Sequence, residues 1–364
     1  MTEPRTVGTI ELPPACTDLA ARVDRELERF VAGQRAALDA LDPAAGTLVG
    51  EIERVIGSGG KRLRPLFCCL GHMAAGAEVG ETAIRAASAL ELLHTFAIVH
   101  DDVMDRSAAR RGSPSSWVHL AEEHRREGFV GDAASYGDAA AVLAGDMALV
   151  LADRALLESG FPPERLQPAF RRYDRMRVEV VAGQYLDVRA AHRGVADEAE
   201  ARRIAVLKSG GYTVEAPLEI GAVLGGAAAG VLRPLAGFGV RLGEAFQLRD
   251  DVLGTFGDPA VTGKDRDSDL REGKRTLMLA KAAAAASDED RAFLERRIGR
   301  PDLTDDELER ARSLIAESGA LDATVELVAD LVQEAKRHLD GAPIPDDARK
   351  LLDAMADVVA VRRL

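Results

Sequence analysis

Apolar residues recur along this chain at spacings of three and four positions, which is the pattern of helices with one buried face. The clearest stripe is Leu308, Ala311 and Ile315, and a capping box at Thr304 and Glu307 precedes it. Strict alternation of apolar and polar residues, which would indicate strands, never lasts long. The sequence therefore predicts an all-α protein.

Short breaks divide this helical pattern. They include the pair Asp42-Pro43, the glycine-rich segment 57–60 and the polar segment 106–136. Because most breaks are only a few residues long, we expect residues 15–364 to form a single large domain, preceded by a flexible tail over residues 1–14. The longest helices are expected over residues 18–41, 82–105, 137–157, 168–191 and 198–224.

Composition and charge exclude some classes of function. The formal net charge of −13 over 364 residues argues against a nucleic-acid partner. The chain has only three cysteines and no apolar signal segment at its N-terminus, so the reducing cytoplasm is the expected location. Apolar runs stay shorter than the roughly eighteen residues that a membrane-spanning helix needs, so no membrane span is expected.

Two clusters of aspartates interrupt apolar, helix-like segments. They are Asp101, Asp102 and Asp105 in the first cluster, and Asp250 and Asp251 in the second. Carboxylates on apolar helices are costly unless a positive charge satisfies them, and oxygen ligands at this spacing suit Mg²⁺. The alternatives are an exposed acidic patch for the first cluster and a polar helix end for the second. Gly254 stands where the spacing of the first cluster would place a third aspartate.

Basic segments accompany the aspartate clusters. One is Gly-Gly-Lys-Arg-Leu-Arg-Pro at 59–65, and others are Arg110-Arg111 and Lys274-Arg275. Lysine and arginine together with a carboxylate-bound Mg²⁺ are how proteins hold a diphosphate. Segment 59–65 alone could equally be the solvated start of a helix. Taken with the aspartates, the basic segments predict an enzyme that binds diphosphates.

The ordered succession of motifs resembles the trans-type isoprenyl diphosphate synthases of the polyprenyl synthetase family. The resemblance covers roughly residues 50–280, and each motif is weak alone while the ordered set is specific. The motifs are segment 59–65, His-Asp-Asp-Val-Met-Asp at 100–105, Arg-Arg-Gly at 110–112, Gly-Asp at 145–146, Gly-Gln-Tyr-Leu-Asp at 183–187, Lys-Ser-Gly-Gly-Tyr-Thr at 208–213, Gln-Leu-Arg-Asp-Asp at 247–251, Gly-Lys at 263–264 and Asp-Leu-Arg-Glu-Gly-Lys-Arg-Thr at 269–276.

The resemblance implies an antiparallel helix bundle around a deep apolar cavity, usually a homodimer. It implies that Mg²⁺, three ions with substrate bound and replaceable by Mn²⁺, is held by Asp101, Asp102, Asp105 and Asp250, and by Asp251 through water. It assigns isopentenyl diphosphate to Lys61, Arg64, His94 and Arg111. It assigns the allylic diphosphate to Arg110, Lys208, Ser209, Gln247, Lys264 and Lys274. Gln184 and Asp187 would act beside the metals and the reacting carbons. Ser209 stands where threonine is usual, and the hydroxyl is retained.

The resemblance also implies a product, geranylgeranyl diphosphate with twenty carbons. In this family a large residue five positions before the first aspartate, with a small one after it, is typical of that length. Here these are Phe96 and Ala97, and Leu93 lies on the same helical stripe. Geometry alone leaves open whether Phe96 forms the cavity floor or ordinary core. The alternatives are a farnesyl or longer polyprenyl diphosphate synthase, a class I terpene cyclase and a non-catalytic regulatory subunit.

Overall fold

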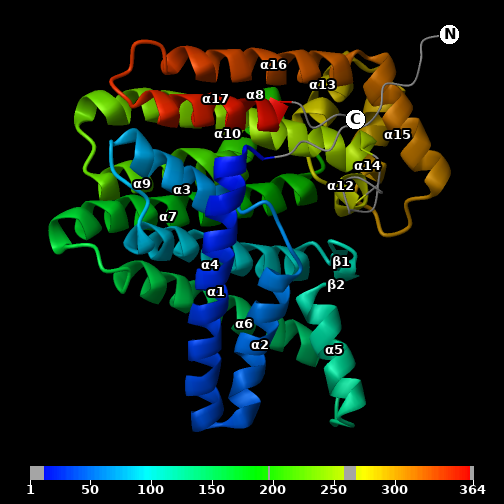
Figure 1. The fold of residues 1–364 in the computed structure, drawn as a ribbon. Helices are drawn as coiled ribbons and strands as arrows, with labels where there is room; N and C mark the ends of the chain where they lie inside the picture. The colour runs from blue at the N-terminus through cyan, green and yellow to red at the C-terminus, as the bar shows by residue number, and fades with distance from the viewer. Residues whose placement is uncertain (1–11, 196, 258–267, 361–364) are drawn as a thin grey trace. The chain divides into compact units, whose positions relative to one another are not determined.

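The computed structural model describes residues 12–195, 197–257 and 268–360. Within these ranges the chain is helical apart from one hairpin of two-residue strands, so the predicted all-α class is confirmed (Figure 1). The chain divides into two compact units. Of the described residues, the N-terminal unit comprises those of Asp18–Arg171 and Pro217–Ala227, and the C-terminal unit comprises those of 12–17, Arg172–Ala216 and 228–360. That residues 15–364 act as one domain stays a prediction.

The N-terminal unit is a cluster of helices with α4 at its core. Helix α4 packs chiefly on α6, and α3 also contacts it. Helices α1 and α2 run side by side, and Arg35 Nη1 on α1 donates to Glu53 Oε2 on α2 at 2.9 Å (Figure 1). The elements are α1 (Pro14–Leu41), α2 (Pro43–Gly57), α3 (Leu63–Ala74), α4 (Glu81–Met104), β1 (Ala109–Arg110), β2 (Ser113–Pro114), α5 (Ser116–Arg126), α6 (Ala133–Leu157), the start of α7 (Pro163–Arg193) and most of α9 (Ala216–Gly225).

Among the described residues, α4 is the one helix long and apolar enough to cross a membrane by length and composition. Its most apolar window is 72% buried inside the protein, which is typical of a core helix. Its buried residues include Leu90, Leu92 and Val99. Burial of this helix therefore accounts for its apolar character.

The C-terminal unit is built around α10, which packs on η1 and α16. Helix η1 has π-helical hydrogen bonding, a form found mostly at functional sites. Val252 of α10 joins a buried cluster with Leu270 and Met278. The elements are the rest of α7, α8 (Glu198–Ala205), η1 (Val206–Glu215), α10 (Ala229–Phe256), α12 (Ser268–Glu272), α13 (Leu277–Ala285), α14 (Asp288–Arg297), α15 (Asp305–Glu317), α16 (Ala320–His338) and α17 (Asp346–Ala360).

Several local expectations change in detail. The first helix begins at Pro14 rather than Asp18, since proline suits the first turn of a helix. The helix expected over 198–224 is instead three consecutive elements, α8, η1 and α9. The polar segment 106–136 contains a hairpin and helix α5. The capping box at Thr304 and Glu307 is confirmed, with both of its hydrogen bonds present.

Candidate active site

The first aspartate cluster closes α4 in the N-terminal unit. The backbone N–H of Asp105, the residue after the helix, donates to Asp101 O at 2.8 Å. Carboxylates are unfavourable at a helix C-terminus, where the helix dipole is negative. Arg110, on β1, compensates: its Nε and Nη2 donate to Asp102 Oδ1 at 2.8 and 2.7 Å, and Nη2 lies 3.5 Å from Asp101 Oδ2. The cluster is therefore a charged site that already attracts a cation.

A group of positive charges surrounds His94, two turns before Asp101 on α4. Burial, together with the charge of four nearby arginines, holds the pKa of the His94 imidazole well below its usual range. These arginines are Arg64, Arg111, Arg110 and Arg62. Burial also lowers the pKa of Arg111, and the other three arginines add to that effect. Arg64, Arg110 and Arg111 beside a neutral imidazole form a site suited to an anion of high charge, as a diphosphate is.

Of the residues expected to bind isopentenyl diphosphate, Arg64, His94 and Arg111 are thus brought close together within one unit. Lys61 precedes Arg64 by three residues and is half-buried. Arg110 lies close both to this group and to the aspartates, so it joins the positive group to the negative one.

The residues expected to set product length lie just before the aspartates on α4. Leu93 is buried, whereas Phe96 and Ala97 are half-buried. The Phe96 ring meets the His100 ring edge-on, with centroids 4.8 Å apart. His100 Nε2 lies 3.0 Å from the carbonyl oxygen of Val142 on α6, and a side chain on Gly145 would overlap the His100 ring. The orientation of Phe96 therefore depends on α6 as well as on α4.

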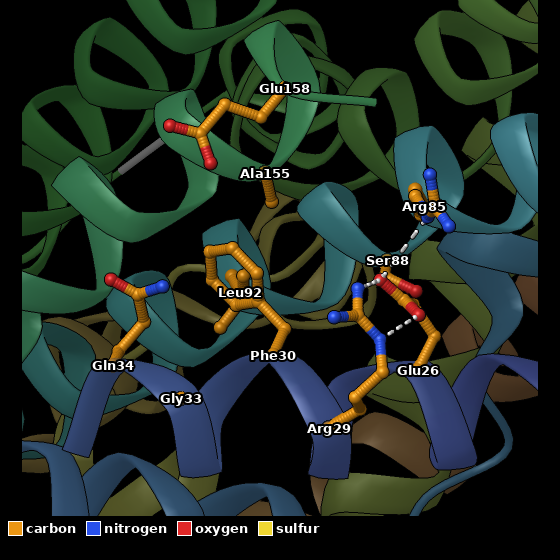
Figure 2. Close-up of a pocket in the computed structure, with 10 residues that line it drawn as sticks. All are labelled: Glu26, Arg29, Phe30, Gly33, Gln34, Arg85, Ser88, Leu92, Ala155 and Glu158. Carbon is orange, nitrogen blue, oxygen red and sulfur yellow. Dashed lines mark hydrogen bonds and ion pairs between the residues drawn. The ribbon is translucent and has the colours of Figure 1, made fainter. Parts of the chain in front are cut away.

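A pocket of about 340 Å³ opens elsewhere in the N-terminal unit (Figure 2). It is lined by α1, α4 and the end of α6, and its lining includes Phe30, Leu92 and the hydrogen-bonded side chains of Glu26 and Arg29 (Figure 2). It contains none of the predicted site residues. Its charged lining also differs from the apolar cavity that the resemblance implies.

The second aspartate cluster lies near the end of α10 in the C-terminal unit. Asp251 is 9% exposed, and Gln247 Nε2 donates to its Oδ1 at 2.6 Å. Burial, followed by the nearby charge of Asp269 and then that of Asp250, raises the pKa of Asp251 to about 8. Crowded, buried carboxylates of this kind are stabilised by a cation or by a proton.

Gly254 makes room for another carboxylate. A side-chain carbon at position 254 would overlap Oδ2 of Asp269, which lies on α12. Lys274 Nζ donates to Asp269 Oδ1 at 3.1 Å and lies 2.5 Å from Glu272 Oε2. Asp269 thus occupies the space beside Asp251 into which a third aspartate on α10 would project. The sequence patterns did not identify Asp269 as a site residue, although it begins the motif at 269–276. The glycine at position 254 indicated that another group could fill the space of a third aspartate.

The other predicted residues of this unit lie on α7 and η1. Lys208 Nζ donates to Asp187 Oδ2 at 2.6 Å. Gln184, one turn before Asp187 on α7, and Ser209, next to Lys208 on η1, are half-buried. The pairing joins a residue predicted to hold diphosphate to one predicted to act beside the metals. Lys264 lies outside the described residues.

Both clusters fit Mg²⁺ bound partly through substrate. Within the described ranges, no group of three or more His, Cys, Asp or Glu side chains forms a ready-made metal site. Mg²⁺ usually takes one or two carboxylates and completes its six ligands with water and substrate phosphate oxygens. The available donors, which are all carboxylates, match that requirement. Burial first, and then the charges of Asp269 and Asp250, raise the pKa of Asp251, and a bound cation would favour its ionised form.

Comparison with known proteins gives consistent matches. Residues 47–315 match the polyprenyl synthetase family. Geranylfarnesyl diphosphate synthase of Aeropyrum pernix is 34% identical over 330 residues, covering 89% of this chain and 97% of that protein. Geranylgeranyl diphosphate synthase of Methanosarcina mazei is 34% identical over 286 residues, covering 79% and 81%.

A solved structure gives a close match in fold. It is the geranylgeranyl pyrophosphate synthase of Corynebacterium glutamicum, complexed with isoprenyl diphosphate and magnesium, with a TM-score of 0.91 and 34% sequence identity. The match covers 95% of this chain and 99% of that one. The similarity therefore extends over nearly all of both chains.

Proposed function

Because the chain belongs to the polyprenyl synthetase family, we propose that it condenses isopentenyl diphosphate with an allylic diphosphate and releases geranylgeranyl diphosphate. The observation that carries this proposal is the arrangement in the N-terminal unit, where four arginines gather around His94 next to the aspartates that close α4. An anion site adjoining a cation site is what a diphosphate substrate with Mg²⁺ requires. The family assignment favours this activity over the terpene cyclase and the regulatory subunit.

In this proposal the aspartates hold Mg²⁺ against the allylic diphosphate. Asp101 and Asp102 at the end of α4 and Asp105 just after it would do so, together with Asp250 on α10, with Asp251 acting through water. When bound, the metal supplies positive charge that stabilises the diphosphate as a leaving group. We expect three Mg²⁺ ions to bind when substrate is bound, and we expect Mn²⁺ to be able to replace Mg²⁺.

The basic residues divide between two diphosphates. Lys61, Arg64, His94 and Arg111 hold isopentenyl diphosphate; Arg110, Lys208, Ser209, Gln247, Lys264 and Lys274 hold the allylic one. As the allylic C–O bond breaks, negative charge grows on the diphosphate, and fixed cations stabilise that change most. The alkene of isopentenyl diphosphate attacks the allylic cation, and a proton is lost to the released diphosphate. Gln184 and Asp187 are proposed to lie beside the reacting carbons.

The proposed product length of twenty carbons is argued from Phe96 and Ala97. Relatives named for geranylgeranyl, geranylfarnesyl and farnesyl products all match this chain, so product length depends on local residues. Phe96→Ala should lengthen the product beyond that of the wild type, and Ala97→Phe should shorten it. If both variants keep the wild-type product and differ only in stability, Phe96 is ordinary core and the proposed length loses its basis.

The proposed homodimer is supported by exposed apolar side chains. On α6, Leu143, Val150 and Leu157 recur every seven residues, and each is more than half exposed. Apolar stripes left open in this way are typical of protein interfaces. Leu143→Asp should therefore shift sedimentation towards the monomer, whereas Leu41→Asp, at an exposed position on α1, should not.

A cytoplasmic location is also proposed, in keeping with Cys16, Cys68 and Cys69, which are buried free thiols.

The direct test is incubation of the purified protein with isopentenyl diphosphate, Mg²⁺ and each allylic primer in turn. Mass spectrometry of the products should show a C20 diphosphate. Absence of condensation with dimethylallyl, geranyl and farnesyl diphosphate alike would refute the proposed function. A C15 or C25 product would retain the reaction and overturn the proposed length.

A further inference from the structure

Arg62 stands in the middle of segment 59–65 but does not face solvent. Its side chain is 6% exposed, and its guanidinium is directed into the N-terminal unit. Nε donates to Asp24 Oδ1 on α1 at 2.6 Å, and Nη1 donates to Glu91 Oε1 on α4 at 2.9 Å. Nη2 donates to the carbonyl oxygen of Ile56 at 2.8 Å. A guanidinium engaged in this way is unsuited to binding substrate directly.

The backbone of Arg62 is also unusual. Its φ is 51° and ψ is 37°, in the left-handed region, and among the described non-glycine residues only Arg106 and Arg111 share a positive φ. Long side chains occupy this region only where their surroundings hold them, and such positions cluster at functional sites. The two carboxylates that bind the guanidinium supply this restraint.

Through these contacts Arg62 reaches every segment that carries a proposed ligand of isopentenyl diphosphate. Lys61 and Arg64 lie beside it in the chain. Glu91 precedes His94 by three residues, so it is one turn away on the same helix. Arg62 Nη1 also lies 3.3 Å from the carbonyl oxygen of Gly59, and Arg111 Nη1 donates to that same oxygen. The side chain of Arg62 therefore connects the three segments that carry the four proposed ligands of isopentenyl diphosphate.

We propose that Arg62 is a positioning residue for isopentenyl diphosphate. It fixes the relative placement of Lys61, Arg64, His94 and Arg111 without touching substrate. The inference rests on the proposed function, since it concerns the same diphosphate site. It predicts that weakening the contacts of Arg62 impairs one substrate selectively, because the allylic diphosphate is assigned to other residues.

The test uses Arg62→Lys and Asp24→Asn, with Glu53→Gln as the control. Lysine keeps the charge but cannot reach several acceptors in the fixed geometry of a guanidinium. Asp24 is 43% exposed, so the loss of its charge in Asp24→Asn weakens one contact with little threat to folding. Glu53 likewise accepts from an arginine of α1, Arg35, but lies outside the motif. Steady-state kinetics with each substrate varied, and melting temperatures, are measured for all four proteins.

Both test variants should raise KM for isopentenyl diphosphate about tenfold, the effect of disturbing one charged hydrogen bond. The allylic KM and kcat should stay within about twofold of the wild type, and Glu53→Gln should change none of these. If Arg62→Lys does not fold, Asp24→Asn decides. Unchanged kinetics in Asp24→Asn, or equal increases in both KM values, would overturn the inference. A wild-type protein without turnover would instead refute the proposed function.

Discussion

The two aspartate clusters differ in how their negative charge is compensated. In the N-terminal unit, the guanidinium of Arg110 binds Asp102 directly and lies near Asp101. In the C-terminal unit, the amide of Gln247 binds Asp251, and the pKa of that carboxyl is raised to about 8. A guanidinium therefore offsets the negative charge of the first cluster, whereas the raised pKa of Asp251 favours its protonated form. Metal binding near Asp251 should therefore release a proton from that carboxyl.

The largest expected effect on turnover comes from the first cluster. Asp101→Asn should lower kcat by at least about a hundredfold, because a positioned charge that acts on the leaving group is lost. EDTA should abolish turnover, and Mg²⁺ should restore it. The control is Asp138→Asn, which breaks the 2.7 Å ion pair with Arg106 in the same unit and should leave kcat near the wild-type value. Near-normal turnover in Asp101→Asn would remove the metal role from α4.

Gly254→Asp sharpens the comparison, because it gives the second cluster the spacing of the first. If the glycine were merely a missing ligand, the variant would gain activity. The structure predicts the opposite, since the new side chain would displace the Asp269 carboxylate. We expect kcat/KM to fall about tenfold, the loss of one charged contact. The kcat/KM of Gly254→Ala should fall by a similar factor, because the first side-chain carbon already overlaps Asp269. Increased activity in Gly254→Asp would contradict the assignment of Asp269.

The last prediction concerns the stability of the metal-free protein, where no effect on turnover is involved. The pKa of Asp251 rises from its ordinary value of 3.8 to about 8 on folding, so the folded state binds the extra proton between these values. Stability should therefore fall as pH rises through that window, by at most about 1.4 kcal/mol per pH unit. Asp251→Asn should remove this contribution and gain stability relative to the wild type from pH 5 to 8. Parallel urea-unfolding profiles for the two proteins would exclude the raised pKa.

Local patterns in the sequence were enough to predict most of the helices. The apolar run before Asp101 indicated a helix over 82–105, and α4 spans Glu81–Met104. The capping box before α15 was equally local. The π-helical hydrogen bonding of η1 was not predictable in this way. Its residues have ordinary helical spacing, and the close approach of Gly210 on η1 to Gly243 on α10 is seen only in the folded chain.

The candidate site shows the same limit. Motif residues such as Asp102 and Arg64 could be named because their types and order carry the chemistry. The role of Asp269 could not, since it depends on the contact between α12 and the open position at Gly254. Arg62 resembles its basic neighbours in the sequence, and its left-handed backbone and its contacts with Asp24 and Glu91 are visible only in the structure. Residue type predicts which groups can bind a diphosphate, whereas their support depends on packing.

The π-helix η1 has a consequence for attempts to engineer this protein. Programmes that raise heat resistance often replace helical glycines with alanine, which restricts the unfolded chain. Gly210 would be an obvious choice, yet a methyl group there would lie 2.6 Å from the carbonyl oxygen of Gly243 on α10. Relief of that clash would move the segment that carries Lys208 and Ser209. Mutant libraries designed to raise heat resistance should therefore leave Gly210 and Gly243 unchanged and vary exposed positions of α14 to α17 instead.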